Sequence, residues 1–95
     1  MKYKKLRCFK GSTLSFDIPL SNNLVSFRRV VRAEVKKTEG APVARFQTEY
    51  GGGVNIKCRL NPTDSIRLSG QYKYEVSVED NEGIKTLQYG ILEVL

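Results

Sequence analysis

Residues 70–80 read Gly70-Gln-Tyr-Lys-Tyr-Glu-Val-Ser-Val-Glu-Asp80, and apolar and polar residues alternate strictly in their middle part. A period of two places the large apolar groups on one face of a strand and the charged groups on the other. The following residues, Asn81-Glu82-Gly83, favour a tight turn, because Asn and Gly tolerate a positive φ. The side chains expected to point inward are Tyr72, Tyr74, Val76 and Val78.

A second strand follows this turn, in residues 84–94. Its pattern predicts that Leu87 and Tyr89 point inward and that Gly90 forms a bulge. Leu92 and Val94 then continue the inward face. The two strands together predict a long antiparallel hairpin at the end of the sequence.

The segment before the hairpin has the residue types of a short helix. Asn61-Pro62-Thr63-Asp64 supplies a capping residue, a proline at the first helical position and an acidic residue in the first turn. This order predicts one helical turn near residues 62–66. Tyr72, just after Gly70, has the position of a structural tyrosine corner, whose hydroxyl bonds back to the preceding loop.

Five earlier segments alternate in the same way as the hairpin. They are residues 3–9, with Leu6 and Cys8 on one face; residues 14–20, with Leu14, Phe16, Ile18 and Leu20; residues 27–37, with Val31, Ala33 and Val35; residues 43–50, with Ala44, Phe46, Thr48 and Tyr50; and residues 54–60, with Val54, Ile56, Cys58 and Leu60. Turn-forming residues separate them at the spacing expected of an antiparallel sandwich.

The predicted fold class is therefore all-β. We expect a seven-stranded antiparallel immunoglobulin-like β-sandwich with one short helical turn near residues 62–66, in a single domain that spans residues 1–95. A chain of 95 residues supports one core. An open barrel of the oligonucleotide-binding type is the structural alternative.

Composition predicts a folded protein that stays in the compartment where it is made. The hydrophobic content of 40% is sufficient for a core, and no apolar run approaches the length of a membrane span. The basic start of the sequence has no apolar segment behind it, so we expect no signal peptide. Cys8 and Cys58 are expected to be buried free thiols, although a disulfide is possible if their strands face each other.

The residue types of catalysis are poorly represented. The sequence has no histidine, which removes the commonest general base and the commonest metal ligand. The two thiols have no imidazole to activate them. The acidic cluster Glu79-Asp80-Asn81-Glu82 fits a hairpin turn better than a calcium loop, and Gly51-Gly52-Gly53 precedes a strand rather than a helix. We therefore expect no enzymatic activity, no cofactor and no metal.

The net charge of +6 is unevenly distributed. Residues 1–37 hold ten Lys or Arg and two acidic residues, whereas residues 38–95 hold six and eight. If the basic groups of residues 2–10 adjoin those of residues 28–37, they would form a patch able to contact phosphates. Single-strand binders also need exposed aromatic side chains, and most aromatic residues here have core positions, so nucleic acid is not favoured.

Three segments resemble small immunoglobulin-like proteins of tailed bacteriophages and prophages, such as the N-terminal domains of baseplate upper proteins and related virion accessory proteins. These segments are Gly11-Ser-Thr-Leu-Ser-Phe-Asp-Ile-Pro-Leu20, Leu60-Asn-Pro-Thr-Asp-Ser-Ile-Arg-Leu-Ser-Gly-Gln-Tyr-Lys-Tyr-Glu-Val76 and Asp80-Asn-Glu-Gly-Ile-Lys-Thr-Leu-Gln-Tyr-Gly-Ile-Leu-Glu-Val94. Residues 21–53 have no distinctive counterpart.

The resemblance implies a non-enzymatic structural or adaptor protein of a phage particle, in a baseplate, tail or fibre attachment. Its partners would be other phage structural proteins or its own copies in a ring, with no membrane contact. It would reside in the cytoplasm of the bacterial host during assembly and then in the virion. The alternative is a small nucleic-acid-binding protein that uses the basic N-terminal third.

A protein whose surface carries both basic and acidic groups can assemble by docking of the basic groups of one copy on the acidic groups of another. The residues expected to form the assembly or anion-contact surface are Arg28, Arg29, Arg32 and Lys36 on one side and Glu75, Glu79 and Glu82 on the other.

Overall fold

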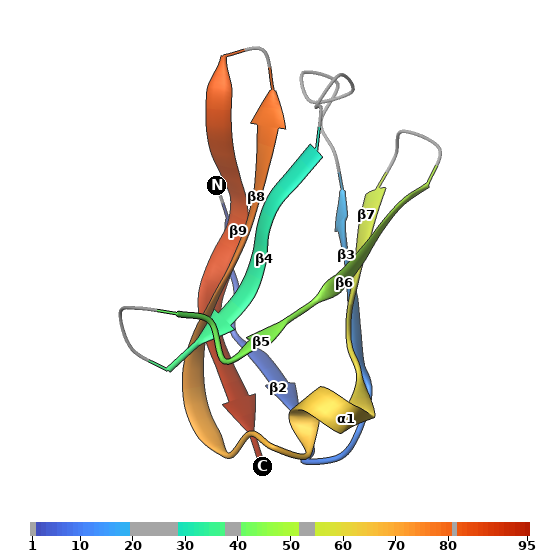
Figure 1. Cartoon of the computed structure of the whole chain (residues 1–95), viewed down its shortest axis with the longest axis vertical. Coiled ribbons are helices and arrows are strands. Elements are labelled where there is room, and N and C mark those ends of the chain that lie inside the picture. Colours follow the sequence, from blue (N-terminus) through green and yellow to red (C-terminus); the bar gives the residue numbers. More distant parts are fainter. Residues whose placement is uncertain (1, 20–28, 38–40, 52–54, 81) are drawn as a thin grey trace.

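The computed structural model describes residues 2–19, 29–37, 41–51, 55–80 and 82–95, which form two facing β-sheets and one short helix (Figure 1). The predicted all-β sandwich is therefore confirmed. The larger sheet contains β1 (Lys2–Tyr3), β2 (Leu6–Cys8), β4 (Arg29–Lys36), β5 (Ala44–Arg45), β8 (Gly70–Asp80) and β9 (Gly83–Val94). The smaller sheet contains β3 (Leu14–Pro19), β6 (Gln47–Gly51) and β7 (Asn55–Leu60), and the helix is α1 (Pro62–Ser65).

The strand order explains how the chain builds the two layers. The larger sheet has the order β1-β9-β8-β4-β5, with β2 continuing beside β9, and the smaller sheet has the order β3-β7-β6. β1 and β2 pair with β9 in parallel, so the expectation of a purely antiparallel sandwich does not hold at this edge. Alternation determines the face of a side chain but not the direction of the partner strand, which is why the sequence did not show this pairing.

Two predicted strands are each divided in two, so the described residues hold nine strands rather than seven. Residues 3–9 break at Lys4 and Lys5, between β1 and β2. Residues 43–50 break at Phe46, where the chain leaves β4 of the larger sheet and joins β7 of the smaller one. Thr48 lies opposite the buried Cys58 and so has the predicted inward register, but it is exposed because β6 is an edge strand. The side chain of Tyr50 lies outside the described residues.

The hairpin of β8 and β9 has its bulge at Leu87 and not at Gly90. Val76 pairs with Gln88 and Ser77 with Thr86, which leaves Leu87 as the extra residue. A residue inserted in a ladder changes the face of those beyond it. Gln88 consequently points inward, and Tyr89, predicted to be in the core, is exposed on the outer face.

A second bulge, in β4, corrects another core prediction. The pairing of β4 with β8 shifts between Val30 and Arg32, so Val31 has no direct partner. Val30 packs against the core in place of the predicted Val31. Ala33 packs against the core and Val35 is fully buried, as predicted. Arg32 and Glu34 therefore both lie on the outer face of the sheet.

The core lies between the two sheets and is largely apolar. An aromatic cluster occupies its centre, in which the ring of Phe16 meets that of Phe46 edge to face at a centroid distance of 5.2 Å, and both approach Tyr74 at 6.1 Å. The largest fully buried apolar side chains are Ile56, Leu60, Leu92, Val35, Val76 and Val78. No buried side-chain nitrogen or oxygen within the described ranges is left without a hydrogen-bond partner.

The helical corner lies where it was predicted, and α1 begins at Pro62 after an extended Asn61. The side chain of Asn61 makes no capping hydrogen bond, contrary to its predicted role. The buried hydroxyl of Ser65 donates to the carbonyl of Ser12 at 2.7 Å. The hydroxyl of Tyr72 accepts a hydrogen bond from the backbone N–H of Ser69 at 2.8 Å, which is the contact that a tyrosine corner requires. Gly70, between Ser69 and Tyr72, has a φ of 92°, and this left-handed conformation allows the chain to reverse direction there.

The hydroxyl of Tyr74 fixes the N-terminal strands against the hairpin. It donates to the carbonyl of Lys4 at 2.6 Å and accepts from the side-chain amide of Gln88 at 3.0 Å. Burial raises the pKa of this hydroxyl, so it remains a donor at neutral pH. The same crossing requires Gly90, because a Cβ at that position would lie 2.1 Å from the carbonyl oxygen of Lys4.

Replacement of this hydroxyl should test its contribution to stability. We expect Tyr74→Phe to lower the free energy of unfolding by about 1–3 kcal/mol, because the partly buried carbonyl of Lys4 and the buried amide of Gln88 lose their partner. The measurement is urea denaturation. Tyr89→Phe removes an exposed hydroxyl and should change stability by less than about 0.5 kcal/mol. Equal effects of the two substitutions would contradict the assigned role of Tyr74.

Candidate binding face

The outer face of the larger sheet carries a row of side chains that crosses five strands. Strand register places Tyr3 beside Tyr89, Tyr89 opposite Glu75, Glu75 opposite Glu34, and Glu34 opposite Arg45. The adjacent row contains Ile91, Lys73 and Lys36. These two rows, together with the next row of Arg32, Ser77 and Thr86, form the candidate binding face.

Charges of the same sign stand directly opposite each other on this face. Glu34 pairs in register with Glu75, and Lys36 pairs with Lys73. Directly opposed like charges destabilise an antiparallel pair. Two such pairs in succession are therefore an unfavourable feature of the sheet that stability alone does not explain.

The outer face of the smaller sheet provides the contrast. There Lys57 lies between Asp17 and Glu49, so each cross-strand neighbour has the opposite sign. Arg59 donates from its guanidinium to the side-chain oxygen of Gln47 at 3.1 Å. This second face balances its own charges, as a solvated surface is expected to do.

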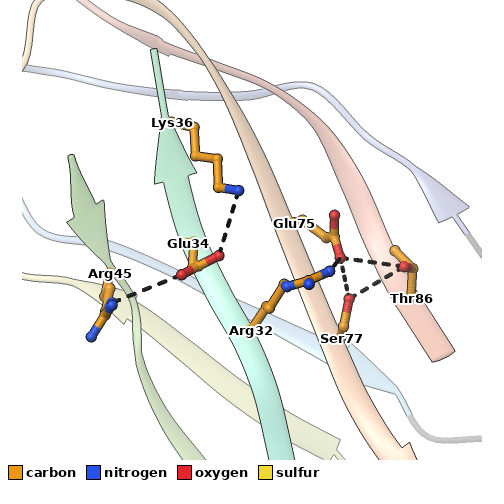
Figure 2. Close-up of polar contacts among 7 residues, drawn as sticks. All are labelled: Arg32, Glu34, Lys36, Arg45, Glu75, Ser77 and Thr86. Carbon is orange, nitrogen blue, oxygen red and sulfur yellow. Dashed lines mark hydrogen bonds and ion pairs between the residues drawn. The ribbon is translucent and has the colours of Figure 1, made fainter. Parts of the chain in front are cut away.

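The two glutamates of the binding face are held by neighbouring groups (Figure 2). One oxygen of Glu75 accepts hydrogen bonds from the hydroxyls of Ser77 and Thr86 and lies 3.6 Å from the guanidinium of Arg32. Ser77 is fully buried beneath this cluster. The carboxylate of Glu75 is therefore fixed in place and largely neutralised.

Glu34 is held in a similar way. Its carboxylate lies 3.9 Å from Arg45 and 4.0 Å from the ammonium of Lys36, and its side chain is only 17% exposed (Figure 2). The side chain of Lys73 has no hydrogen bond or ion pair with any residue that the structure describes. The two arginines already equal the two glutamates in number, so Lys36 and Lys73 leave this face with an excess of positive charge, although Lys36 also lies near Glu34.

A shallow groove of about 380 Å³ lies over the two rows. Lys36 and Lys73 line it together with Glu34 and Glu75, and Tyr3, Tyr89 and Ile91 form its less polar end. The ring of Tyr3 meets that of Tyr89 edge to face at a centroid distance of 5.4 Å. Exposures of 57% for Tyr3 and 39% for Tyr89 leave these rings accessible.

The structure brings together only some of the residues predicted for an assembly surface. Arg32, Lys36 and Glu75 lie on the binding face, whereas Arg28 and the side chain of Arg29 lie outside the described residues. Arg29 is paired through its backbone with Glu79, and Glu82 forms an ion pair with Lys85 at 3.4 Å. The predicted basic and acidic groups thus lie on neighbouring strands of one chain.

The basic residues near the N-terminus do not adjoin those of β4. They lie along β1 and β2 at one edge, and β9 and β8 separate that edge from β4. Arg7 is already paired with Glu93 at 2.9 Å. The continuous basic patch that nucleic-acid binding would use is therefore interrupted on the described part of this sheet. Nor do any three His, Cys, Asp or Glu residues within the described ranges come together to hold a metal ion.

Sequence reasoning missed the aromatic end of the groove and one member of each like-charge pair, namely Lys73 and Glu34. Tyr89 was assigned to the core because the bulge was placed at Gly90. The sequence did contain evidence for the outer face. Residues two apart in a strand share a face, so Tyr89 has the same orientation as Ile91 and Glu93 when the strand is counted back from its C-terminal end.

The cysteines do not contribute chemistry to this face. Both are buried free thiols, Cys8 in the larger sheet and Cys58 in the smaller one. Burial raises the pKa of Cys8. Burial, assisted by the nearby carboxylate of Asp17, raises the pKa of Cys58 to about 12. Because the thiolate is the nucleophile, neither group is activated at neutral pH.

No protein-family model matches the sequence, and no curated protein matches it. Solved structures do match the fold. The chain aligns with the GspB Siglec domain at 14% identity and a TM-score of 0.62, covering 96% of this chain and 53% of that one. It also aligns with the endo-fucoidan hydrolase MfFcnA4 of glycoside hydrolase family 107 at 13% identity and a TM-score of 0.59, covering 100% of this chain and 13% of that enzyme. At these identities the likeness concerns the fold alone.

The like-charge pair of lysines should have a measurable effect on stability. We expect Lys73→Thr to be more stable than Lys57→Thr by about 0.5–1 kcal/mol, because the first substitution removes a repulsion and the second removes two attractions. Both variants introduce the same strand-forming residue, so each is the control of the other. Urea denaturation at low salt measures the difference, and high salt should reduce it. A more stable Lys57→Thr would contradict the electrostatic interpretation.

The buried thiol of Cys58 should make stability depend on alkaline pH. The raised pKa means that the folded state keeps the proton which the unfolded state releases near the ordinary thiol pKa of 9.0. The stabilisation that the protonated thiol contributes is fully present below that pH. It should decline between pH 9 and about pH 12 by about 1.4 kcal/mol per pH unit. Denaturation of Cys58→Ala over the same range is the control, and an equal slope in both proteins would contradict the prediction.

Proposed function

We propose that the protein is a non-enzymatic structural or adaptor module that acts through contacts with another protein, as in the baseplate, tail or fibre attachment of a phage or prophage particle. The observation that supports contact through the binding face is the presence of two cross-strand pairs of like charge together with two accessible tyrosines. The phage setting is supported by the sequence resemblance.

The edges of the larger sheet favour docking on its face rather than strand addition. One edge is formed by β1 and β2, whose exposed Lys2, Lys4, Lys5 and Arg7 discourage pairing with another strand. The opposite edge is β5, which is only two residues long. A partner therefore gains most by covering the outer face, where charge and aromatic surface are both available.

Crosslinking should locate the contact with a partner. The experiment mixes the protein with particle proteins encoded by neighbouring genes and applies a lysine-reactive crosslinker, followed by mass spectrometry. We expect crosslinks at Lys36 and Lys73 and none at Lys57, which lies on the other sheet. Lys73→Thr should weaken the complex in size-exclusion chromatography, and Lys57→Thr should not.

Two further measurements separate the alternatives. Light scattering of the protein alone at low salt distinguishes a ring of its own copies from docking on a different protein. A salt titration with random single- and double-stranded DNA tests the nucleic-acid alternative. DNA affinity that survives physiological salt, together with crosslinks confined to Lys57, would overturn the proposal.

A further inference from the structure

The groove on the binding face combines two chemically different ends. One end has the ammonium groups of Lys36 and Lys73, which stand opposite each other on β4 and β8. The other end has the rings of Tyr89 and Tyr3 and the side chain of Ile91, on β9 and β1. A ligand that fits both ends must carry an anionic group close to a flat, weakly polar surface.

The basic end selects an anion. The described part of the face has four cations, Arg32, Lys36, Arg45 and Lys73, and two carboxylates, those of Glu34 and Glu75. Each carboxylate is matched by an arginine, and Lys73 has no partner among the described residues. The ammonium of Lys36 lies 4.0 Å from the carboxylate of Glu34, which is too far for a hydrogen bond. An anion placed between Lys36 and Lys73 would therefore relieve their repulsion and accept charge-assisted hydrogen bonds from both.

The aromatic end selects a ring rather than a bare ion. Tyr89 and Tyr3 are accessible, and their mutual edge-to-face contact holds them in place. Tyrosine supplies a rigid, amphipathic contact surface with little loss of conformational entropy. The C–H face of a pyranose ring can lie against such a surface while its hydroxyl groups remain in water or reach the carboxylates of Glu34 and Glu75.

The size and place of the groove favour a sugar over an extended peptide. A volume of about 380 Å³ is at the lower end of the range for small-molecule sites. The groove lies over β8 and β9, whose backbone groups are already used by their own ladder and by the neighbouring strands. An extended peptide would find no free strand edge there, and would lose the main-chain bonds that make strand addition favourable.

We propose that this groove binds a sugar that carries a carboxylate, with the carboxylate between Lys36 and Lys73 and the pyranose ring against Tyr89. This site goes beyond the proposed contact with a protein partner, although it occupies the same face. A single sugar unit of this size is expected to bind with a dissociation constant on the order of 1 mM.

The test is a titration of the isotope-labelled protein, followed by amide chemical shifts, with methyl glucuronide and with methyl glucoside. The two ligands differ by one carboxylate, so they isolate the contribution of the charge. We expect the glucuronide to shift the amides of residues 73–75 and 89–91 and to bind at least about tenfold more tightly than the glucoside. Equal affinities, or shifts confined to the smaller sheet, would overturn the proposal.

Substitutions at Lys73 and Tyr89 test the contribution of each end of the groove to binding. Lys73→Thr and Tyr89→Leu change exposed side chains and should each weaken glucuronide binding about tenfold, whereas Lys57→Thr should leave it unchanged. Acetate titrated to the same concentration should not reproduce the affinity. An equal response to acetate would show an adventitious ion only and reject the sugar site.

An acidic peptide provides the remaining comparison. If a short Asp- and Glu-containing peptide bound the same amides more tightly than the glucuronide, the groove would be a protein-docking site and the sugar proposal would be wrong. The proposed function would then stand. Conversely, glucuronide binding without crosslinks at Lys36 and Lys73 would retain the sugar site and reject the protein contact.

Discussion

The hydroxyl of Tyr74 determines where the first strands of the chain lie. By donating to the carbonyl of Lys4 and accepting from Gln88, it holds the break between β1 and β2 over Gly90, where only a hydrogen atom fits. β1 and β2 pair in parallel with β9 on either side of that attachment. This pairing sets Tyr3 beside Tyr89, which forms the aromatic end of the groove. An internal hydrogen bond in the core thus shapes a surface feature on the opposite side of the sheet.

Most of the fold could be predicted from the sequence, but much less of the candidate site could be. Alternation in residues 70–80 and the residue types of Asn61 to Asp64 were sufficient to place β8 and α1, because both depend on local backbone preferences. The direction of β1 and β2 and the bulge at Leu87 depend on contacts between distant segments, which alternation cannot report. The error at Leu87 moved Tyr89 from the surface to the core. Recognition of Glu34 opposite Glu75 required the register of β4 on β8, which a second bulge also alters.

The two outer faces of the sandwich show how differently one chain can treat its surface charges. Lys57 between two acidic residues lowers the energy of the smaller sheet, whereas Lys36 opposite Lys73 raises that of the larger one. Both faces are solvated, so solubility does not distinguish them. The larger sheet tolerates the repulsion because β8 lies between β4 and β9 in a long ladder, and Val76 and Val78 on its inner face are fully buried.

The glutamates of the binding face are held by groups other than Lys73, and this leaves the charge of Lys73 exposed to a ligand. Glu75 is bound by Ser77, Thr86 and Arg32, and Glu34 lies near Arg45 and Lys36, so neither carboxylate can turn to neutralise Lys73 fully. If Glu75 were free to move, it would pair with Lys73 and neutralise the basic end of the groove. Its attachment to other partners keeps Lys73 available. The buried hydroxyl of Ser77 is therefore as important to the binding face as the exposed ammonium groups, because it fixes the acid that would otherwise compete with an incoming anion.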